Sequence, residues 1–185
     1  MKLFRKYFHQ NIPLKISFVF VLDIFISYHW NDSQTASNEI QVTPGTDYSD
    51  ARRIALDISE SSTLNIWLDV KSLSNQSNIS VYEQHAFAIK RCRVFIAFVS
   101  DQYAASMFCR MQFQFACGFP DKIVIPIIVD CSTNGATATP SWRSSVIGMS
   151  LDVDKERYQV FDLSTVDSDS KYKDMVGQIS MAVNT

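Results

Sequence analysis

Residues 94–100 read VFIAFVS, an uninterrupted run of mostly aromatic and β-branched side chains that ends at a serine. Such a run is typical of a strand whose two faces are both buried, as in a parallel sheet covered by helices on each side. Similar runs lie at 19–28, 65–68 and 124–129, and a weaker one lies at 158–163. The sequence therefore predicts a parallel sheet of five strands.

The stretches between these runs have the spacing of helices. Apolar side chains recur every three or four residues from 51 to 58, and Ser49 is the predicted N-cap of this helix. The same spacing holds from 82 to 91 and from 172 to 183, whereas residues 104–118 are apolar on almost every side. Strands that alternate with helices predict right-handed crossovers and an α/β fold with helices on both faces of the sheet.

Length and composition describe one compact globular domain. The chain has 185 residues, with 17 Lys and Arg against 19 Asp and Glu, and this balance excludes a nucleic-acid binder that works through a strong overall positive field. A hydrophobic fraction of 46% excludes an intrinsically disordered chain. The cysteines show neither zinc-ligand spacing nor a disulfide pattern. We therefore expect no metal site and no structural disulfide.

The sequence does not have the pattern of a membrane span or of a cleaved signal peptide. The apolar stretch 16–28 is interrupted by Asp23, and its longest clean part, 16–22, is far shorter than the ~20 residues that a spanning helix needs. No small-residue cleavage site follows this stretch. We expect a cytoplasmic protein without a membrane span.

Several kinds of catalytic or nucleotide site lack their motifs. The chain has no GxxxxGKS or GxxxxGKT phosphate loop, no GxGxxG dinucleotide fingerprint and no GxSxG hydrolase elbow. A response-regulator receiver shares the alternation of strands and helices, but it needs an acidic pair after the first strand and a lysine after the last core strand. Here residues 27–30 read SYHW, and Val129 is followed by Asp130. The receiver remains a distant alternative.

The ends of three predicted strands bring polar and aromatic residues to one edge of the sheet. Ligands of doubly wound sheets bind outside the carboxyl ends of the strands. Here these ends are followed by residues 27–32, 69–80 and 100–106. We expect these segments to form one cleft, with the rings of Tyr28, Trp30 and Tyr103 available for stacking. The alternative is that these rings only pack the loops.

Six short motifs, in this order, resemble those of TIR (Toll/interleukin receptor) domains, in particular stand-alone animal TIR domain proteins. They are DIFISY at 23–28, IWLD at 66–69, SDQYAAS at 100–106, SMFC at 106–109, IPII at 125–128, and Trp142 with Gly148 ahead of the last strand. The resemblance implies a flavodoxin-like TIR fold over residues 22–182. Residues 1–21 are expected to form an N-terminal extension and the start of the first strand, and residues 183–185 a C-terminal tail.

The resemblance implies one of two functions. Some TIR domains assemble with other TIR domains in signal transduction, including innate immunity. Others cleave the nicotinamide–ribose bond of NAD with a Glu on the third helix, three residues after the Cys of an S-x-x-C motif. In this chain that position is Gln112, and Gln114 stands at another position that is frequently acidic.

We therefore expect a signalling protein that requires no cofactor, with Gln112 inactivating the catalytic position. The alternative is an enzyme for which NAD is the substrate. Rescue by another acid stays open, because Asp69, Glu83 and Asp101 lie on segments that border the same cleft. The strand ends and the resemblance together give the candidate ligand-binding residues: Ser27, Tyr28, Trp30, Asp69, Ser100, Tyr103, Ser106 and Cys109.

Two further features predict an interface for a weak homo-oligomer. In TIR domains the loop after the second strand contacts neighbouring TIR domains. Its candidate contact residues here are Lys71, Ser72, Leu73, Ser74 and Asn75. Phe113 and Cys117 lie on a different face of the third helix from Met111 and Phe115, and an exposed apolar face there would seek a partner. The alternatives are an ordinary surface loop, and burial of that helix face under neighbouring helices.

Overall fold

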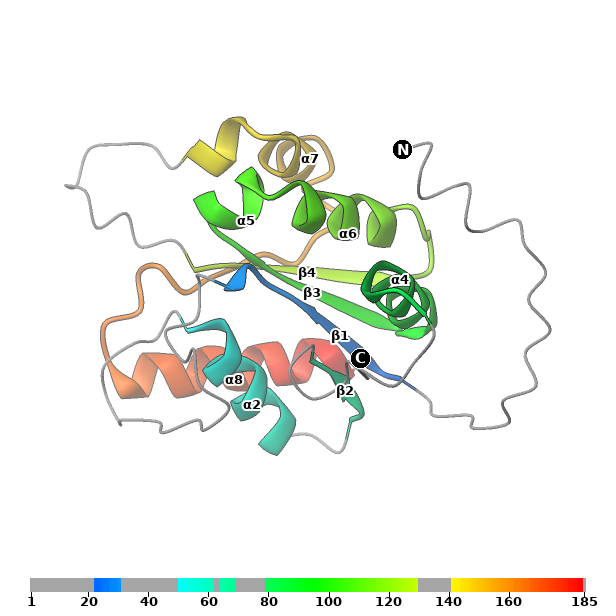
Figure 1. The fold of residues 1–185 in the computed structure, drawn as a ribbon. Helices are drawn as coiled ribbons and strands as arrows, with labels where there is room; N and C mark the ends of the chain where they lie inside the picture. The colour runs from blue at the N-terminus through cyan, green and yellow to red at the C-terminus, as the bar shows by residue number, and fades with distance from the viewer. Residues whose placement is uncertain (1–21, 31–49, 62–63, 69–78, 130–140, 185) are drawn as a thin grey trace.

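The computed structural model describes residues 22–30, 50–61, 64–68, 79–129 and 141–184, which form an α/β domain of three layers (Figure 1). Its strands are β1 (Ile24–Ser27), β2 (Ile66–Trp67), β3 (Val94–Val99), β4 (Ile123–Ile128) and β5 (Phe161–Asp162). They form one parallel sheet in the order β2-β1-β3-β4-β5. The predicted parallel sheet of five strands is confirmed.

Helices cover both faces of this sheet. They are α2 (Ala51–Glu60), α4 (Val81–Arg91), α5 (Asp101–Ala105), α6 (Met107–Cys117), the short 3-10 helix η2 (Ser141–Ser144), α7 (Val146–Val153) and α8 (Asp169–Asn184). In Figure 1, α2 and α8 lie below the sheet, and α4, α5, α6 and α7 lie above it. A flavodoxin-like strand order of this kind places its ligand site at the carboxyl ends of β1 and β3.

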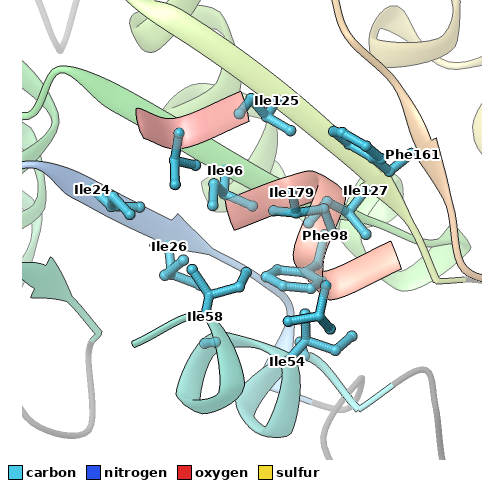
Figure 2. Packing of buried hydrophobic residues seen from close by; sticks show 14 of the residues in the cluster. Ile24, Ile26, Ile54, Ile58, Ile96, Phe98, Ile125, Ile127, Phe161 and Ile179 are labelled. Atoms are coloured by element: carbon cyan, nitrogen blue, oxygen red, sulfur yellow. The ribbon is translucent and has the colours of Figure 1, made fainter. Parts of the chain in front are cut away.

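Two apolar clusters, one on each face of the sheet, form the core. Figure 2 shows the first, in which side chains of β1, β3 and β4 pack against α2 and α8; it includes Ile24, Ile26, Ile54, Ile58, Ile96, Phe98, Ile125, Ile127, Phe161 and Ile179. The second lies under α4, α5, α6 and α7, and includes Phe25, Phe95, Val99, Tyr103 and Phe113. Because β1 and β3 are buried on both faces, their sequences do not alternate between apolar and polar residues.

The N-cap of α2 is Asp50 and not the predicted Ser49. The Asp50 carboxylate accepts hydrogen bonds from the backbone N–H groups of Arg52 and Arg53, at 2.9 and 3.1 Å. This side chain therefore satisfies two of the donors that the first helical turn leaves unpaired. Both residue types are good N-caps, and the predicted N-cap was one residue too early.

The predicted helix 104–118 is two helices, α5 and α6, that meet at Ser106. The backbone N–H of Ser106 donates to the carbonyl of Gln102, at 3.0 Å, and this bond ends α5. The hydroxyl of Ser106 accepts from the backbone N–H of Cys109, at 3.3 Å, and this bond begins α6. One serine therefore serves as the C-cap of one helix and the N-cap of the next.

The remaining differences concern the C-terminal third of the domain. The elements η2 and α7 have no counterpart among the predicted helices. Helix α8 continues to Asn184, and Val183 is fully buried, so the packed domain extends into the residues that were expected to form a tail. Within the described ranges, no helix is both long and apolar enough to cross a lipid bilayer.

Candidate functional site

A cleft of about 410 Å³ opens where β1, α4 and α6 come together. It is lined by Ile26, Ser27, Tyr28, His29, Trp30, Trp67, Val81, His85, Ser106, Phe108, Cys109 and Gln112. The cleft lies at the carboxyl end of β1, as the topology of the sheet requires. Five of the predicted ligand-binding residues line it: Ser27, Tyr28, Trp30, Ser106 and Cys109.

The buried polar floor of the cleft consists of Ser27 and Gln112, with Tyr103 behind them. The hydroxyl of Ser27 donates to Oε1 of Gln112, at 2.6 Å, and the Tyr103 hydroxyl lies 2.7 Å from the same Ser27 oxygen. Because the single Ser27 hydrogen goes to Gln112, the Tyr103 hydroxyl is the donor of the second bond. Gln112 is only 3% exposed, so this chain of hydrogen bonds fixes its side chain in a neutral, largely dry environment.

Two predicted ligand-binding residues, Ser100 and Tyr103, do not line the cleft. The Ser100 hydroxyl caps α5 by accepting from the backbone N–H of Tyr103, at 2.9 Å. The Tyr103 ring is fully buried in the core, so the expectation that it is available for stacking is wrong. Both residues support the floor of the cleft from the core side. Ser100 caps the turn of α5 that contains Tyr103, and the Tyr103 hydroxyl donates to Ser27.

Of the two other aromatic residues considered for stacking, Trp30 is 68% exposed and Tyr28 is buried. The Tyr28 hydroxyl accepts a hydrogen bond from Nε of Arg52, at 2.8 Å, and its backbone carbonyl lies 3.8 Å from Sγ of Cys109. These contacts hold the end of β1 against α2 and α6. Trp30 also lines the cleft and is the more exposed of these two rings.

An aromatic wall of the cleft was not predicted from the sequence. The rings of Trp67 and His85 lie 4.6 Å apart, edge to face, and the ring of Phe108 lies 4.9 Å from that of His85. The carbonyl oxygen of Val81 lies 2.7 Å from Nδ1 of His85 and can only accept, so Nδ1 carries the proton. The spacing of His85 from Ala88 and Ile89 was the available signal, since these three residues share the buried face of α4.

The carboxylates considered for rescue are engaged elsewhere. The Glu83 carboxylate accepts hydrogen bonds from the hydroxyl and the backbone N–H of Ser80, at 2.8 and 2.9 Å, and these bonds lower the pKa of Glu83. The Asp101 carboxylate accepts from the backbone N–H of Trp142, at 2.7 Å. Asp69 lies outside the described residues. In the part of the chain that the structure describes, the cleft lining contains no carboxylate.

Of the predicted interface residues, the structure describes only the two on α6. Lys71, Ser72, Leu73, Ser74 and Asn75 lie outside the described residues. Phe113 is 1% exposed in the core under α6, so the expectation that it forms part of an interface is wrong for the folded chain. Cys117 is half-buried; the Tyr158 hydroxyl lies 3.4 Å from its sulfur, and burial raises the pKa of its thiol.

Across the ranges that the structure describes, no group of three or more His, Cys, Asp or Glu side chains is placed to hold a metal ion. Among the described residues, Cys92, Cys109 and Cys117 are thiols that form no disulfide bond. Cys131 lies outside the described residues, so the absence of a disulfide in the whole chain stays a prediction.

Comparisons with known proteins point to one family. A family model described as a TIR domain matches residues 44–174. The crystal structure of the TIR domain of the Toll-related receptor TRR-2 from Hydra magnipapillata is similar over 89% of this chain and 99% of its own, with a TM-score of 0.53 and 11% identity. The TIR domains of the activated Roq1 resistosome, which recognises the pathogen effector XopQ, match 88% of this chain and 84% of theirs, with a TM-score of 0.42 and 16% identity. No curated protein sequence matched this chain.

Proposed function

Because this chain belongs to the TIR domain family, we propose that it is a cytoplasmic signalling protein that acts through contacts with other TIR domains and does not cleave NAD efficiently. The proposed process is innate-immune signalling. The observation that carries the proposal is the neutral floor of the cleft, where Gln112 accepts a hydrogen bond from Ser27. The S-x-x-C motif implies that Gln112 stands at the position of the family's catalytic Glu.

A neutral floor is poorly suited to cleavage of the nicotinamide–ribose bond. Departure of nicotinamide leaves positive charge on the ribose, as in glycoside hydrolysis, and a nearby carboxylate stabilises that charge. Gln112 has the size of a Glu and can hydrogen-bond a ribose hydroxyl, but it has no charge. Loss of one electrostatic group of this kind typically lowers the rate by about 10²–10³. Glu83 and Asp101 are held in other hydrogen bonds, so neither supplies the missing charge from its present position.

An exposed apolar surface beside the cleft supports the contacts with other TIR domains. Trp30, Val81, Tyr82 and Met107 are all exposed there, and Met107 is 69% exposed. The Tyr82 ring packs edge to face on Phe108, with 5.0 Å between ring centroids, so the apolar surfaces of α4 and α6 are continuous. A continuous exposed apolar patch of this kind is typical of a protein-interaction site.

We expect the protein to self-associate weakly, and Met107→Ser to weaken this association by about fivefold, which is the effect of removing a contact of about 1 kcal/mol. Interfaces of this kind are small and transient. Met181→Ser is the matched control, because Met181 on α8 is 65% exposed and lies away from the cleft. Sedimentation across a wide range of concentrations measures both variants. A strict monomer at high concentration, with and without NAD, would refute the proposal.

The alternative function is NAD cleavage, and the intact cleft with its ordered floor is the observation that favours it. We expect little or no release of nicotinamide from NAD by the natural protein, and a gain of roughly tenfold or more from Gln112→Glu, or about 1.4 kcal/mol of barrier. The gain should be in turnover and not in affinity for NAD, because the charge acts mainly in the transition state. The Ser27 hydroxyl, which donates to Gln112, can donate equally to a carboxylate.

Gln114→Glu is the control for this experiment, since it adds the same charge to an exposed position of the same helix. Nicotinamide release, followed by chromatography, should not increase in this variant. Rapid cleavage of NAD by the natural protein would show that another acidic residue stabilises the transition state and that the proposed inactivity is wrong. If the Gln112→Glu variant binds NAD but remains silent, the missing Glu is not the only defect of the site.

A further inference from the structure

A second cavity, of about 170 Å³, lies between η2, α7 and the carboxyl end of β4. Three apolar side chains form part of its lining, namely Ile128 and Leu151, which are buried, and Val160, which is 43% exposed. An apolar cavity of about 150 Å³ is large enough to hold a benzene molecule. The described residues that line this cavity are different from those that line the cleft, so the two sites are separate.

One buried hydrogen-bond donor at this cavity is unpaired. It belongs to Trp142, which lines the cavity and is 3% exposed. The backbone N–H of Trp142 donates to the Asp101 carboxylate, at 2.7 Å, and its carbonyl accepts from the Ser145 hydroxyl, at 2.6 Å. Its indole Nε1–H, in contrast, has no hydrogen-bond partner within the described ranges. Because an indole N–H only donates and an unpaired buried donor is destabilising, the group that completes this site is an acceptor.

The charged side chains that line the cavity favour an anion as this acceptor. The guanidinium of Arg143 lies over the Trp142 ring, with 4.6 Å between Cζ and the ring centroid, so a positive charge stands on the same indole that carries the unpaired N–H. Lys155 and Asp152 also line the cavity, with Nζ and Oδ1 3.9 Å apart, and their opposite charges offset each other. The excess charge is therefore that of Arg143, and a guanidinium pairs well with a carboxylate.

We propose that this cavity binds a small monocarboxylate whose apolar body is about the size of a benzene ring. The carboxylate accepts hydrogen bonds from Nε1 of Trp142 and from the Arg143 guanidinium, and the apolar body packs against Ile128 and Leu151. The site is held in shape before a ligand arrives, because α7 packs closely on η2 at Gly148, where a Cβ atom would lie 2.2 Å from the Arg143 carbonyl oxygen. A preformed site loses less free energy to ordering when it binds. This binding depends neither on NAD cleavage nor on contacts between TIR domains.

Proton–nitrogen nuclear magnetic resonance of the full chain tests this proposal through the indole N–H groups. The chain has three tryptophans, Trp30, Trp67 and Trp142, so it gives three such signals, and Trp142→Phe identifies the signal of Trp142. With benzoate as the probe, we expect the Trp142 signal to shift with a Kd of about 1 mM, as suits so small a ligand, and the other two signals to shift little. Benzyl alcohol has the same ring without the charge and should bind at least about fivefold more weakly.

Two pairs of variants locate the binding site. Arg143→Gln should weaken benzoate binding by about fivefold, whereas Arg91→Gln, which removes the same charge from an exposed position of α4, should change it little. Val160→Phe is expected to fill the cavity and to abolish the shift of the Trp142 signal. Val81→Phe is its matched control, because Val81 is similarly exposed but lines the cleft, and this variant should preserve the shift.

Four results would overturn the proposal. The first is no shift of the Trp142 signal at about 20 mM benzoate, which would leave water as the acceptor. The second is binding of benzyl alcohol as tight as that of benzoate, and the third is an equal loss in Arg91→Gln and Arg143→Gln. The fourth is loss of the shift in Val81→Phe but not in Val160→Phe, which would place the probe in the cleft.

Discussion

Phe113→Ala is expected to lower the free energy of unfolding by about 3–5 kcal/mol, because it empties a large volume in the core between α6 and the sheet. Phe113 is 1% exposed and packs in the cluster that contains Phe25 and Val99. In a domain of this size the loss corresponds to a fall of roughly 10 °C or more in the midpoint of thermal unfolding. Thermal and urea unfolding of the variant measure this change.

Met107→Ala is the control for this prediction, since it truncates an apolar side chain of the same helix that faces solvent. It should change the free energy of unfolding by less than about 0.5 kcal/mol. The comparison also decides between the two roles considered for Phe113. If Phe113→Ala reduced self-association while leaving unfolding unchanged, Phe113 would contact a partner and its burial in the single chain would not hold in solution.

Gly148→Ala is expected to destabilise the domain by about 3 kcal/mol or more, because there is no space for a side chain at this position. A Cβ atom on Gly148 would lie 2.2 Å from the carbonyl oxygen of Arg143 and 2.6 Å from its Cα atom. Both of these are backbone atoms of η2, so rotation of a side chain cannot relieve the overlap. Helix α7 would have to move away from η2, and thermal unfolding would record the loss.

Gly177→Ala is the matched substitution with the opposite expected sign. Gly177 lies within α8 and is exposed, and a Cβ atom there meets nothing within 4 Å. Alanine should stabilise this helix by about 0.5–1 kcal/mol, because it reduces the conformational freedom of the unfolded chain. Equal effects at the two glycines would show that helix propensity, and not the approach of α7 to η2, sets the cost at Gly148.

The third helix shows how far the sequence could predict the site. Its buried residues are Cys109, Gln112, Phe113 and Ala116, at the spacing of one helix face. Hydrophobicity alone did not show which face of α6 is buried, because the buried face contains Gln112 and the exposed side contains Met107. The motif S-x-x-C singled out Gln112 by its position along the chain, and Gln112 lines the cleft. The placement of Phe113 at an interface failed, since residues 104–118 are apolar on almost every side and such a pattern does not show which face is buried.

Local patterns in the sequence determined the strands of the central sheet and the main helices that cover it. The spacing of apolar residues indicates which side of an element is buried, and capping residues indicate where a helix begins and ends. The tertiary structure alone decided which side chains meet. Ser27 bonds to Tyr103 and Gln112, which lie 76 and 85 residues away in the chain. These contacts require β1, α5 and α6 to be packed together first. A local sequence pattern does not show which group a hydroxyl bonds to. The distance between the hydroxyl and its partner is set by the long-range packing of several helices and strands.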